Sequence, residues 1–154
     1  MGGPMAAEKG ELVHIVSGSK KAFLKVKPII DKLAKSVFYI GEDVGPANVV
    51  KLALNLNISL IAGAISEGIT LVKAANINPE IFIKIINATY FKTGVSENKG
   101  PKMIKNDFEP SFYLKNMLKD LELTTSMSQS LGVSLPLTSL AQQIYRAANN
   151  MGVF

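Results

Sequence analysis

A lysine and an asparagine lie four residues apart inside an apolar segment, and their types and spacing could carry out acid–base chemistry. In "GEDVGPANVVKLALN", residues 41 to 55, Lys51 and Asn55 fall one turn apart if the segment is helical. A partly desolvated lysine can exchange a proton near neutral pH, and a neighbouring amide can donate a hydrogen bond to a carbonyl or carboxylate oxygen. The same spacing is typical of a polar seam exposed on a bundle helix, and that alternative stays open.

A second segment, "FYLKNMLKD", brings other polar groups together. Phe112 and Lys119 are seven residues apart, so on a helix they would lie near one face, with Asp120 beside them. From spacing alone, this segment is equally typical of an ordinary amphipathic helix with a solvated lysine.

Composition excludes several kinds of chemistry. The chain has no cysteine, which removes disulfides, thiolate catalysis and cysteine-ligated metals, and its one histidine, His14, cannot form a metal site by itself. The net charge of +5 comes almost wholly from lysine, with Arg146 as the one arginine, so we expect a solvated basic surface or an anionic ligand and no nucleic-acid partner. No G-x-G pair and no P-loop are present.

The elements that must position these residues change in type along the chain. Residues 11–18 and 36–41 are typical of strands and residues 19–35 of a helix, whereas hydrophobic spacing predicts helices from residue 46 onward. We therefore predict a mainly α protein: a small β-α-β unit in residues 1–44, then an all-helical domain in residues 45–154 built on a long helix. The expected helices are 46–75, 79–90, a short one around Met103 within a loop of 91–107, 110–132 and 136–152.

The most apolar stretch, residues 49 to 72, has the length of a membrane span. It contains polar residues that are costly in hydrocarbon, so we predict a helix buried by protein rather than by lipid: Lys51, Asn55, Asn57, Ser59, Ser66 and Glu67. No stretch resembles a signal peptide, and we expect a cytoplasmic location without a membrane partner.

Three segments, in order, resemble the motifs of the β-hydroxyacid dehydrogenase family, which includes 3-hydroxyisobutyrate dehydrogenase and glyoxylate/succinic semialdehyde reductase. "GEDVGPANVVKLALN" resembles its catalytic signature, in which glycines precede a lysine and an asparagine. "FEPSFYLKNMLKDLEL" resembles its later phenylalanine and lysine-aspartate segment, and "MGGPMAAEKGEL" resembles its substrate loop. The "NKGPKM" stretch is most similar to the glyoxylate/succinic semialdehyde reductase branch.

The resemblance implies a Rossmann-type nucleotide-binding domain followed by an all-helical domain, with NADP or NAD as cofactor and a small hydroxyacid or semialdehyde as substrate. It implies a homodimer or higher homo-oligomer. The apolar character of the 46–75 helix on nearly every side predicts that the copies meet through this helix. The resemblance also assigns roles to seven residues: Lys51 as catalytic proton donor or acceptor, Lys119 at the cofactor, and Gly2, Gly3, Asn55, Phe112 and Asp120 at the substrate.

The sequence also departs from the family pattern. It begins at the substrate loop, with Met1 where the family has serine, and it lacks the glycine-rich cofactor fingerprint. We therefore expect a C-terminal portion truncated at both ends. Two functions stay open: the substrate-side half of a reductase, or a catalytically inactive helical module for dimerisation or binding.

Overall fold

A computed structural model describes residues 1–152, except for the side chain of Pro4. The chain forms two compact units, Met1–Leu54 and a second unit from Asn55 onward, and one long helix crosses the division. The mainly α fold predicted from the sequence is confirmed. The predicted domain boundary after residue 44 stays a prediction, and the predicted second domain ends on residues 153 and 154, which lie outside the described residues.

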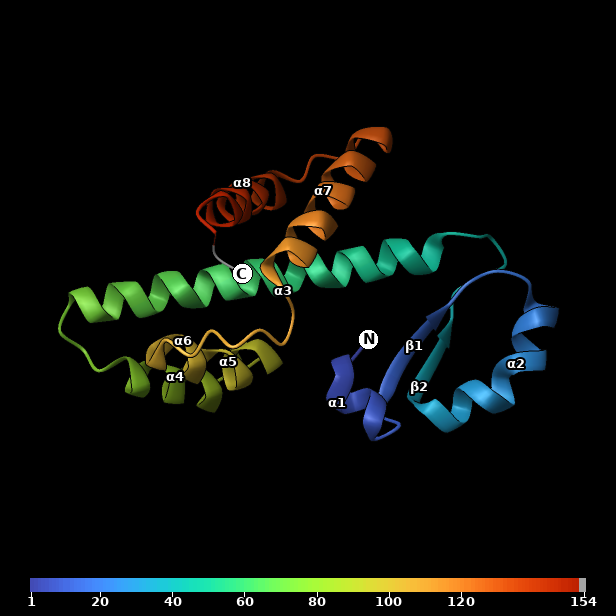
Figure 1. The fold of residues 1–154 in the computed structure, drawn as a ribbon, viewed down its shortest axis with the longest axis horizontal. Coiled ribbons are helices and arrows are strands. Elements are labelled where there is room, and N and C mark those ends of the chain that lie inside the picture. Colours follow the sequence, from blue (N-terminus) through green and yellow to red (C-terminus); the bar gives the residue numbers. More distant parts are fainter. Residues whose placement is uncertain (153–154) are drawn as a thin grey trace. The chain divides into compact units, whose positions relative to one another are not determined.

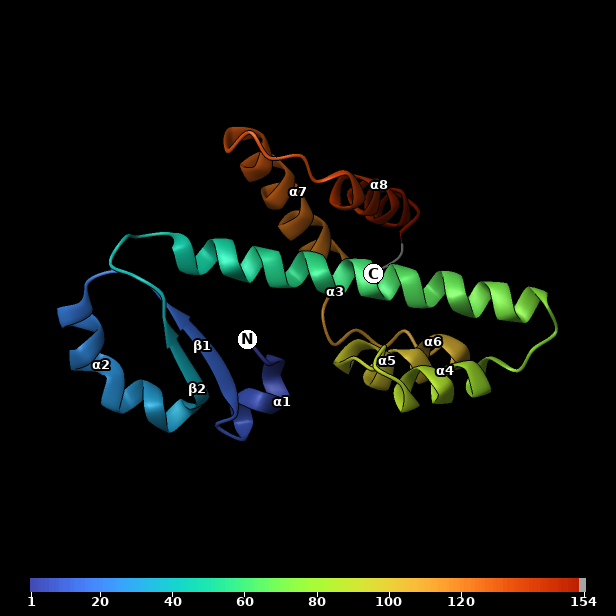
Figure 2. The same ribbon diagram turned by 180° about the vertical axis from the view of Figure 1, so that it is seen from behind.

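The first unit is a small β-α-β layer (Figures 1 and 2). Helix α1 (Gly3–Glu8) precedes strand β1 (Leu12–Val16), helix α2 (Lys20–Leu33) and strand β2 (Ala34–Tyr39). The two strands pair in parallel, and α2 packs on them as the crossover helix that a parallel pair requires. The rings of Phe23 and Tyr39 stack with centroids 4.9 Å apart and join α2 to β2.

Two details of this unit differ from the prediction. Strand β2 begins at Ala34, where the backbone turns extended directly after α2, two residues earlier than predicted. The apolar residues at helical spacing along α2 are covered only in part, because Phe23 is buried whereas Val26, Ile29 and Leu33 are exposed. Residues 1–54 alone therefore leave apolar surface on this helix.

The second unit is wholly helical and is organised around the long helix α3 (Pro46–Ala74). Figures 1 and 2 show two groups of shorter helices on opposite sides of α3. One group consists of α4 (Pro79–Ala88), α5 (Gly94–Asn98) and α6 (Gly100–Lys105), and the other of α7 (Leu114–Ser130) and α8 (Pro136–Asn150).

Each group has its own apolar core against α3. In the first, Ile65 and Ile69 of α3 pack with Ile83 of α4, and neighbouring apolar residues surround them. In the second, Leu56 and Leu60 of α3 pack against a core formed by Met117, Leu121 and Ala141. Helix α3 therefore contributes to two separate cores, with Ile65 and Ile69 in the first and Leu56 and Leu60 against the second.

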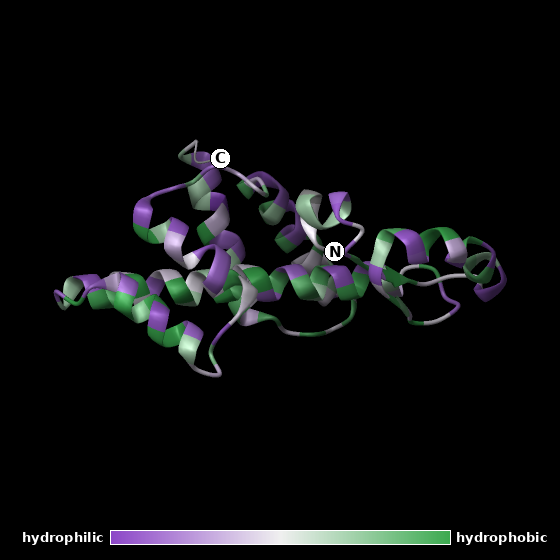
Figure 3. Cartoon of the chain, turned by 90° about the horizontal axis from the view of Figure 1, so that it is seen from below, coloured by the Kyte–Doolittle hydropathy of each residue, from purple (hydrophilic) through white to green (hydrophobic). Residues whose placement is uncertain are grey.

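Within this single chain α3 is buried only in part, and the prediction that protein rather than lipid covers it stays a prediction. Its buried positions include the polar Asn55 and Ser59, whereas Val49, Val50, Leu54 and Ile58 are 37–42% exposed, and Figure 3 shows hydrophobic residues recurring along the helix. Of its most apolar 18-residue stretch, 22% is buried. Among residues 1–152, α3 is the one helix that is long and apolar enough to span a membrane, a criterion that core helices of water-soluble proteins also meet.

Several helix boundaries follow from local chemistry. The side chain of Asn78 caps α4 by accepting a hydrogen bond from the Glu80 N–H at 2.8 Å, and Pro79 occupies the first turn, as predicted. The short helix expected around Met103 is α6.

Helix α5 was missed because its cap is unusual. Thr93 and Ser96 form a reciprocal capping box, in which each side chain accepts from the other's backbone N–H at 2.9 Å. Serine replaces the usual glutamate or glutamine at the third position of this motif, so the sequence signature was not apparent.

The predicted start of the next helix at residue 110 is wrong, because α7 begins at Leu114 after Tyr113 in extended conformation. Pro110 disfavours helical backbone at the residue before it, and the aromatic residues that follow have modest helix propensity.

Candidate functional site

A buried amide–carboxylate pair links α3 to α7. The Asn55 Nδ2 amide donates to Asp120 Oδ2 at 2.6 Å, and the two residues are 6% and 1% exposed. Asn55 and Asp120 are 65 positions apart in the chain, and the packing of both helices around the second core brings them together. The structure therefore joins two site residues that the sequence predicted separately.

The pair defines which way the Asn55 amide faces. An ionised carboxylate has no hydrogen to donate, so the nitrogen of the amide must face Asp120 and its oxygen must face away. Asp120 Oδ1 lies 3.2 Å from Lys119 Nζ, so a cation accompanies the buried carboxylate. The second hydrogen of the Asn55 amide and its oxygen are thus oriented for a further partner.

Lys51 lies one helical turn before Asn55 on α3 and is partly buried. Farther along α3, Ser59 is 1% exposed and its hydroxyl donates to the Leu56 carbonyl at 2.7 Å. The polar seam that the sequence placed on α3 therefore turns toward protein at Asn55 and Ser59, which removes the solvent-exposed alternative for those two positions.

Gly2 and Gly3 begin α1 with backbone that only glycine adopts readily. Their φ angles are +131° and +72°. A Cβ on Gly2 would also lie 2.7 Å from the Cβ of Ala6. Glycine is therefore required at Gly2 by conformation and by space.

The structure does not place Phe112 and Lys119 on one helical face, so that expectation from the sequence is wrong. Phe112 lies before α7 in an irregular segment, residues 107–113, which we call the strap. Lys119 is on α7 with its side chain 61% exposed. The two residues are therefore carried by different elements.

The strap forms one wall of a cavity of about 360 Å³ in the second unit. Its lining is mainly apolar, and the residue before α6 together with residues of α6, α7 and α8 completes it: Lys99, Lys102, Met103, Leu114, Ile144, Tyr145 and Ala148. Burial raises the pKa of the Tyr145 hydroxyl above its usual range.

Two lysines that the sequence did not single out contact the strap. Lys99 Nζ donates to Ser111 Oγ at 2.5 Å, and Lys102 Nζ lies 3.2 Å from Asp107 Oδ2. The hydrogen bond from Lys102, followed by that from the Glu109 backbone N–H, holds the pKa of Asp107 below its usual range. The "KGPK" spacing was the available signal, but nothing in sequence alone shows where those side chains reach.

The described residues also limit the kind of site. Within residues 1–152, no three histidine, cysteine, aspartate or glutamate side chains come together as metal ligands. His14 lies within β1, and its Nε2 is buried. The arrangement at Asn55 and Asp120 is suited to holding a hydrogen-bonding amide in one orientation.

Comparison with known families gives two adjacent matches that together span nearly the whole chain. Residues 45–153 match the family described as NAD-binding of NADP-dependent 3-hydroxyisobutyrate dehydrogenase. Residues 1–41 match the NAD binding domain of 6-phosphogluconate dehydrogenase.

Individual proteins agree with these matches. The chain is 30% identical over 152 residues to glyoxylate/succinic semialdehyde reductase 2, chloroplastic, of Arabidopsis thaliana, covering 99% of this chain and 42% of that protein. It is 32% identical to L-threonate dehydrogenase of Pectobacterium atrosepticum, covering 98% of this chain and 50% of the relative.

A solved structure gives the same fold. The 3-hydroxyisobutyrate dehydrogenase of Salmonella typhimurium superposes with a TM-score of 0.92 at 27% identity, covering 99% of this chain and 54% of that one. The chain thus spans about half the length of the proteins that it matches.

Proposed function

Because the chain belongs to the β-hydroxyacid dehydrogenase family, we propose that it supplies the substrate-binding and proton-transferring half of an NAD(P)-dependent oxidoreductase. The reaction interconverts a small β-hydroxyacid and its semialdehyde. The observation that supports this most is the buried Asn55–Asp120 pair, which orients an amide one helical turn after Lys51.

The cofactor fits these residues only in part. The 154 residues contain no G-x-G pair, so the chain does not hold the glycine-rich turn that receives a dinucleotide pyrophosphate. The exposed ammonium of Lys119 is free to rotate toward an anionic or amide group from its place beside Asp120. When bound, a nicotinamide supplies or accepts the hydride.

Lys51 carries the proton in this proposal. In reduction, its ammonium gives a proton to the carbonyl oxygen of the semialdehyde as that oxygen gains charge, and in oxidation the neutral amine takes the hydroxyl proton. Asn55, with its amide fixed by Asp120, donates its second hydrogen to a substrate oxygen. An amide held in one orientation costs little reorganisation during the reaction.

Gly2, Gly3 and Phe112 are the other residues that contact the substrate in this proposal. The backbone N–H groups near Gly2 and Gly3 bind the substrate carboxylate, which explains a segment where glycine is required. Phe112 lines the cavity beside the strap, whose lining within residues 1–152 does not include Lys51 or Asn55. In this proposal Phe112 covers the apolar part of the substrate, a role that rests on the family resemblance.

We also propose that the chain assembles through α3. The exposed apolar side chains of Val50, Leu54 and Ile58 lie four residues apart along this helix and need a partner surface. A second copy of the chain supplies it. Sedimentation should give a dimer for the native chain and a monomer for Leu54→Glu, and a monomeric native chain would rule out this assembly.

The test of the activity is a matched pair of lysine variants. NADPH-dependent reduction of succinic semialdehyde is measured for the native chain, Lys51→Met and Lys84→Met, each mixed with a separately expressed dinucleotide-binding half of a related reductase. Lys84→Met removes an exposed lysine on α4. Loss of a general acid predicts a fall in kcat of about 10²–10⁴-fold for Lys51→Met, with Lys84→Met unchanged.

The result also separates the two functions. Turnover that survives Lys51→Met would refute the role of this lysine. A native chain that dimerises but shows no turnover with NADPH or NADH would instead favour the alternative, an inactive helical module for dimerisation.

A further inference from the structure

We propose that Lys99 is a positioning residue, which fixes the strap, and with it Phe112, through its hydrogen bond to Ser111. This inference rests on the proposed function, in which Phe112 covers the substrate. It gives a role to a lysine outside the three family-like motifs.

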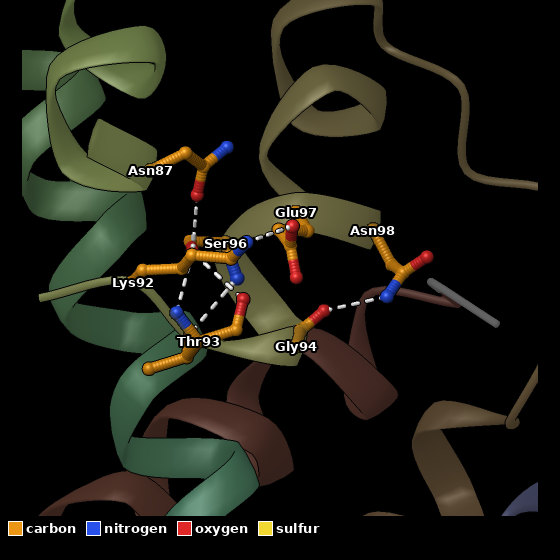
Figure 4. Close-up of polar contacts among 7 residues, drawn as sticks. All are labelled: Asn87, Lys92, Thr93, Gly94, Ser96, Glu97 and Asn98. Carbon is orange, nitrogen blue, oxygen red and sulfur yellow. Dashed lines mark hydrogen bonds and ion pairs between the residues drawn. The ribbon is translucent and has the colours of Figure 1, made fainter. Parts of the chain in front are cut away.

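The platform that carries Lys99 is unusually well fixed. Ser96 is 0% exposed, and Figure 4 shows its hydroxyl at the centre of a cluster with Asn87 and Thr93. The hydroxyl accepts from the Thr93 N–H at 2.9 Å and lies 2.6 Å from Asn87 Oδ1. A buried hydroxyl with its hydrogen bonds made locks the turn between α4 and α5.

The backbone of Lys99 joins this platform to α6. Its N–H donates to the Val95 carbonyl at 2.8 Å, and its own carbonyl accepts from the Met103 N–H at 2.9 Å. The next residue, Gly100, is buried against α4, where a Cβ would lie 2.8 Å from Ile83 Cδ1. The backbone at Lys99, from which its side chain extends, is therefore fixed by hydrogen bonds to Val95 and Met103 and by the packing of Gly100.

The strap, in contrast, has little support of its own. Phe108 and Tyr113 are at least half exposed, and the strap has no regular secondary structure. Lys102 forms an ion pair with Asp107, the first residue of the strap, whereas Lys99 donates to Ser111, the residue directly before Phe112. Lys99, directly before α6, and Lys102, in the first turn of α6, thus attach the strap at two points, and Lys99 is the one that contacts the residue before Phe112.

The tether can be measured without any activity. Because the chain has no cysteine, Glu109→Cys gives one nitroxide label on the exposed strap, and its electron paramagnetic resonance spectrum reports strap mobility. Lys99→Met keeps the length of the side chain but removes the donor. We expect the mobile fraction to rise about two- to fivefold, the range for an exposed charged contact, with Lys84→Met as control.

A double-mutant cycle identifies the bond itself. Ser111→Ala should raise the mobile fraction as much as Lys99→Met does, and the double variant should show no further change. Lys99→Arg, which keeps a donor, should give the native spectrum. An unchanged spectrum in Lys99→Met, or additive effects of the two changes, would overturn the tether.

The kinetic arm tests the consequence for substrate. For succinic semialdehyde, the same variants should raise KM about two- to fivefold with kcat nearly unchanged, because only substrate contact with Phe112 is loosened. An unchanged KM beside a mobile strap would overturn the positioning role. If the native chain shows no turnover, the proposed function fails, and the spectra alone then decide whether Lys99 holds the strap.

Discussion

Removing the amide of Asn55 should destabilise the second unit by an amount that its burial predicts. In Asn55→Ala, the carboxylate of Asp120 loses a donor at 2.6 Å in a place where water cannot substitute, since Asp120 is 1% exposed. A hydrogen bond to a charged group contributes about 1.5–3 kcal/mol. Lys119 Nζ stays 3.2 Å from the other oxygen and offsets part of the loss, so we expect about 2 kcal/mol.

The assays are urea unfolding and thermal unfolding followed by circular dichroism, with Asn48→Ala as control. Asn48 is an exposed amide in the first turn of the same helix. A change of about 2 kcal/mol should lower Tm by about 4–8 °C for a chain of this size. A loss below about 0.5 kcal/mol in Asn55→Ala, or an equal loss in the control, would refute the structural role of the pair.

The variant Asn55→Asp tests the same geometry by charge. It would place two carboxylates at hydrogen-bond distance, so one of them must bind a proton and its pKa in the folded state rises above the unfolded value. The folded state then binds more protons than the unfolded state, and stability increases as the pH falls from neutral through that raised pKa. Stability of this variant that does not rise on mild acidification would contradict the orientation of the pair.

Two further predictions concern packing and charge. Gly68→Ala should lower the free energy of unfolding by about 1–3 kcal/mol, because the new Cβ would lie 2.5 Å from the Phe82 ring. Gly63→Ala, whose Cβ would have nothing within 4 Å, should raise it by about 0.5–1 kcal/mol. Equal unfolding curves for the two variants would refute the packing at Gly68. The lowered pKa of Asp107 means that its contact with Lys102 contributes stability above the ordinary carboxyl pKa and loses it as the pH falls through the folded value. An NMR titration of the carboxyl should move toward the ordinary pKa in Lys102→Met, with the Glu109 N–H still lowering it, and an unchanged titration would show that another group causes the shift.

Local chemistry determined most of the secondary structure in advance. Asn78 and Pro79 predicted the start of α4, where Asn78 caps the first turn. The types and spacing of the apolar residues predicted the strands and the long helices. Boundaries failed where local preferences were weak or atypical. The serine in the α5 capping box and the aromatic residues before α7 are the two examples.

The sequence by itself also identified the family, because the residue types and spacings around Lys51, Asn55 and Lys119 can be recognised within short segments, without knowledge of contacts between distant residues. Tertiary structure decided which polar groups meet. Asn55 and Asp120 are 65 residues apart, and only the packing of α3 on α7 brings them to 2.6 Å. It likewise decided that Asn55 and Ser59 of α3 are buried while Val50, Leu54 and Ile58 stay exposed, since periodicity defines the faces of a helix but not which of them another element covers.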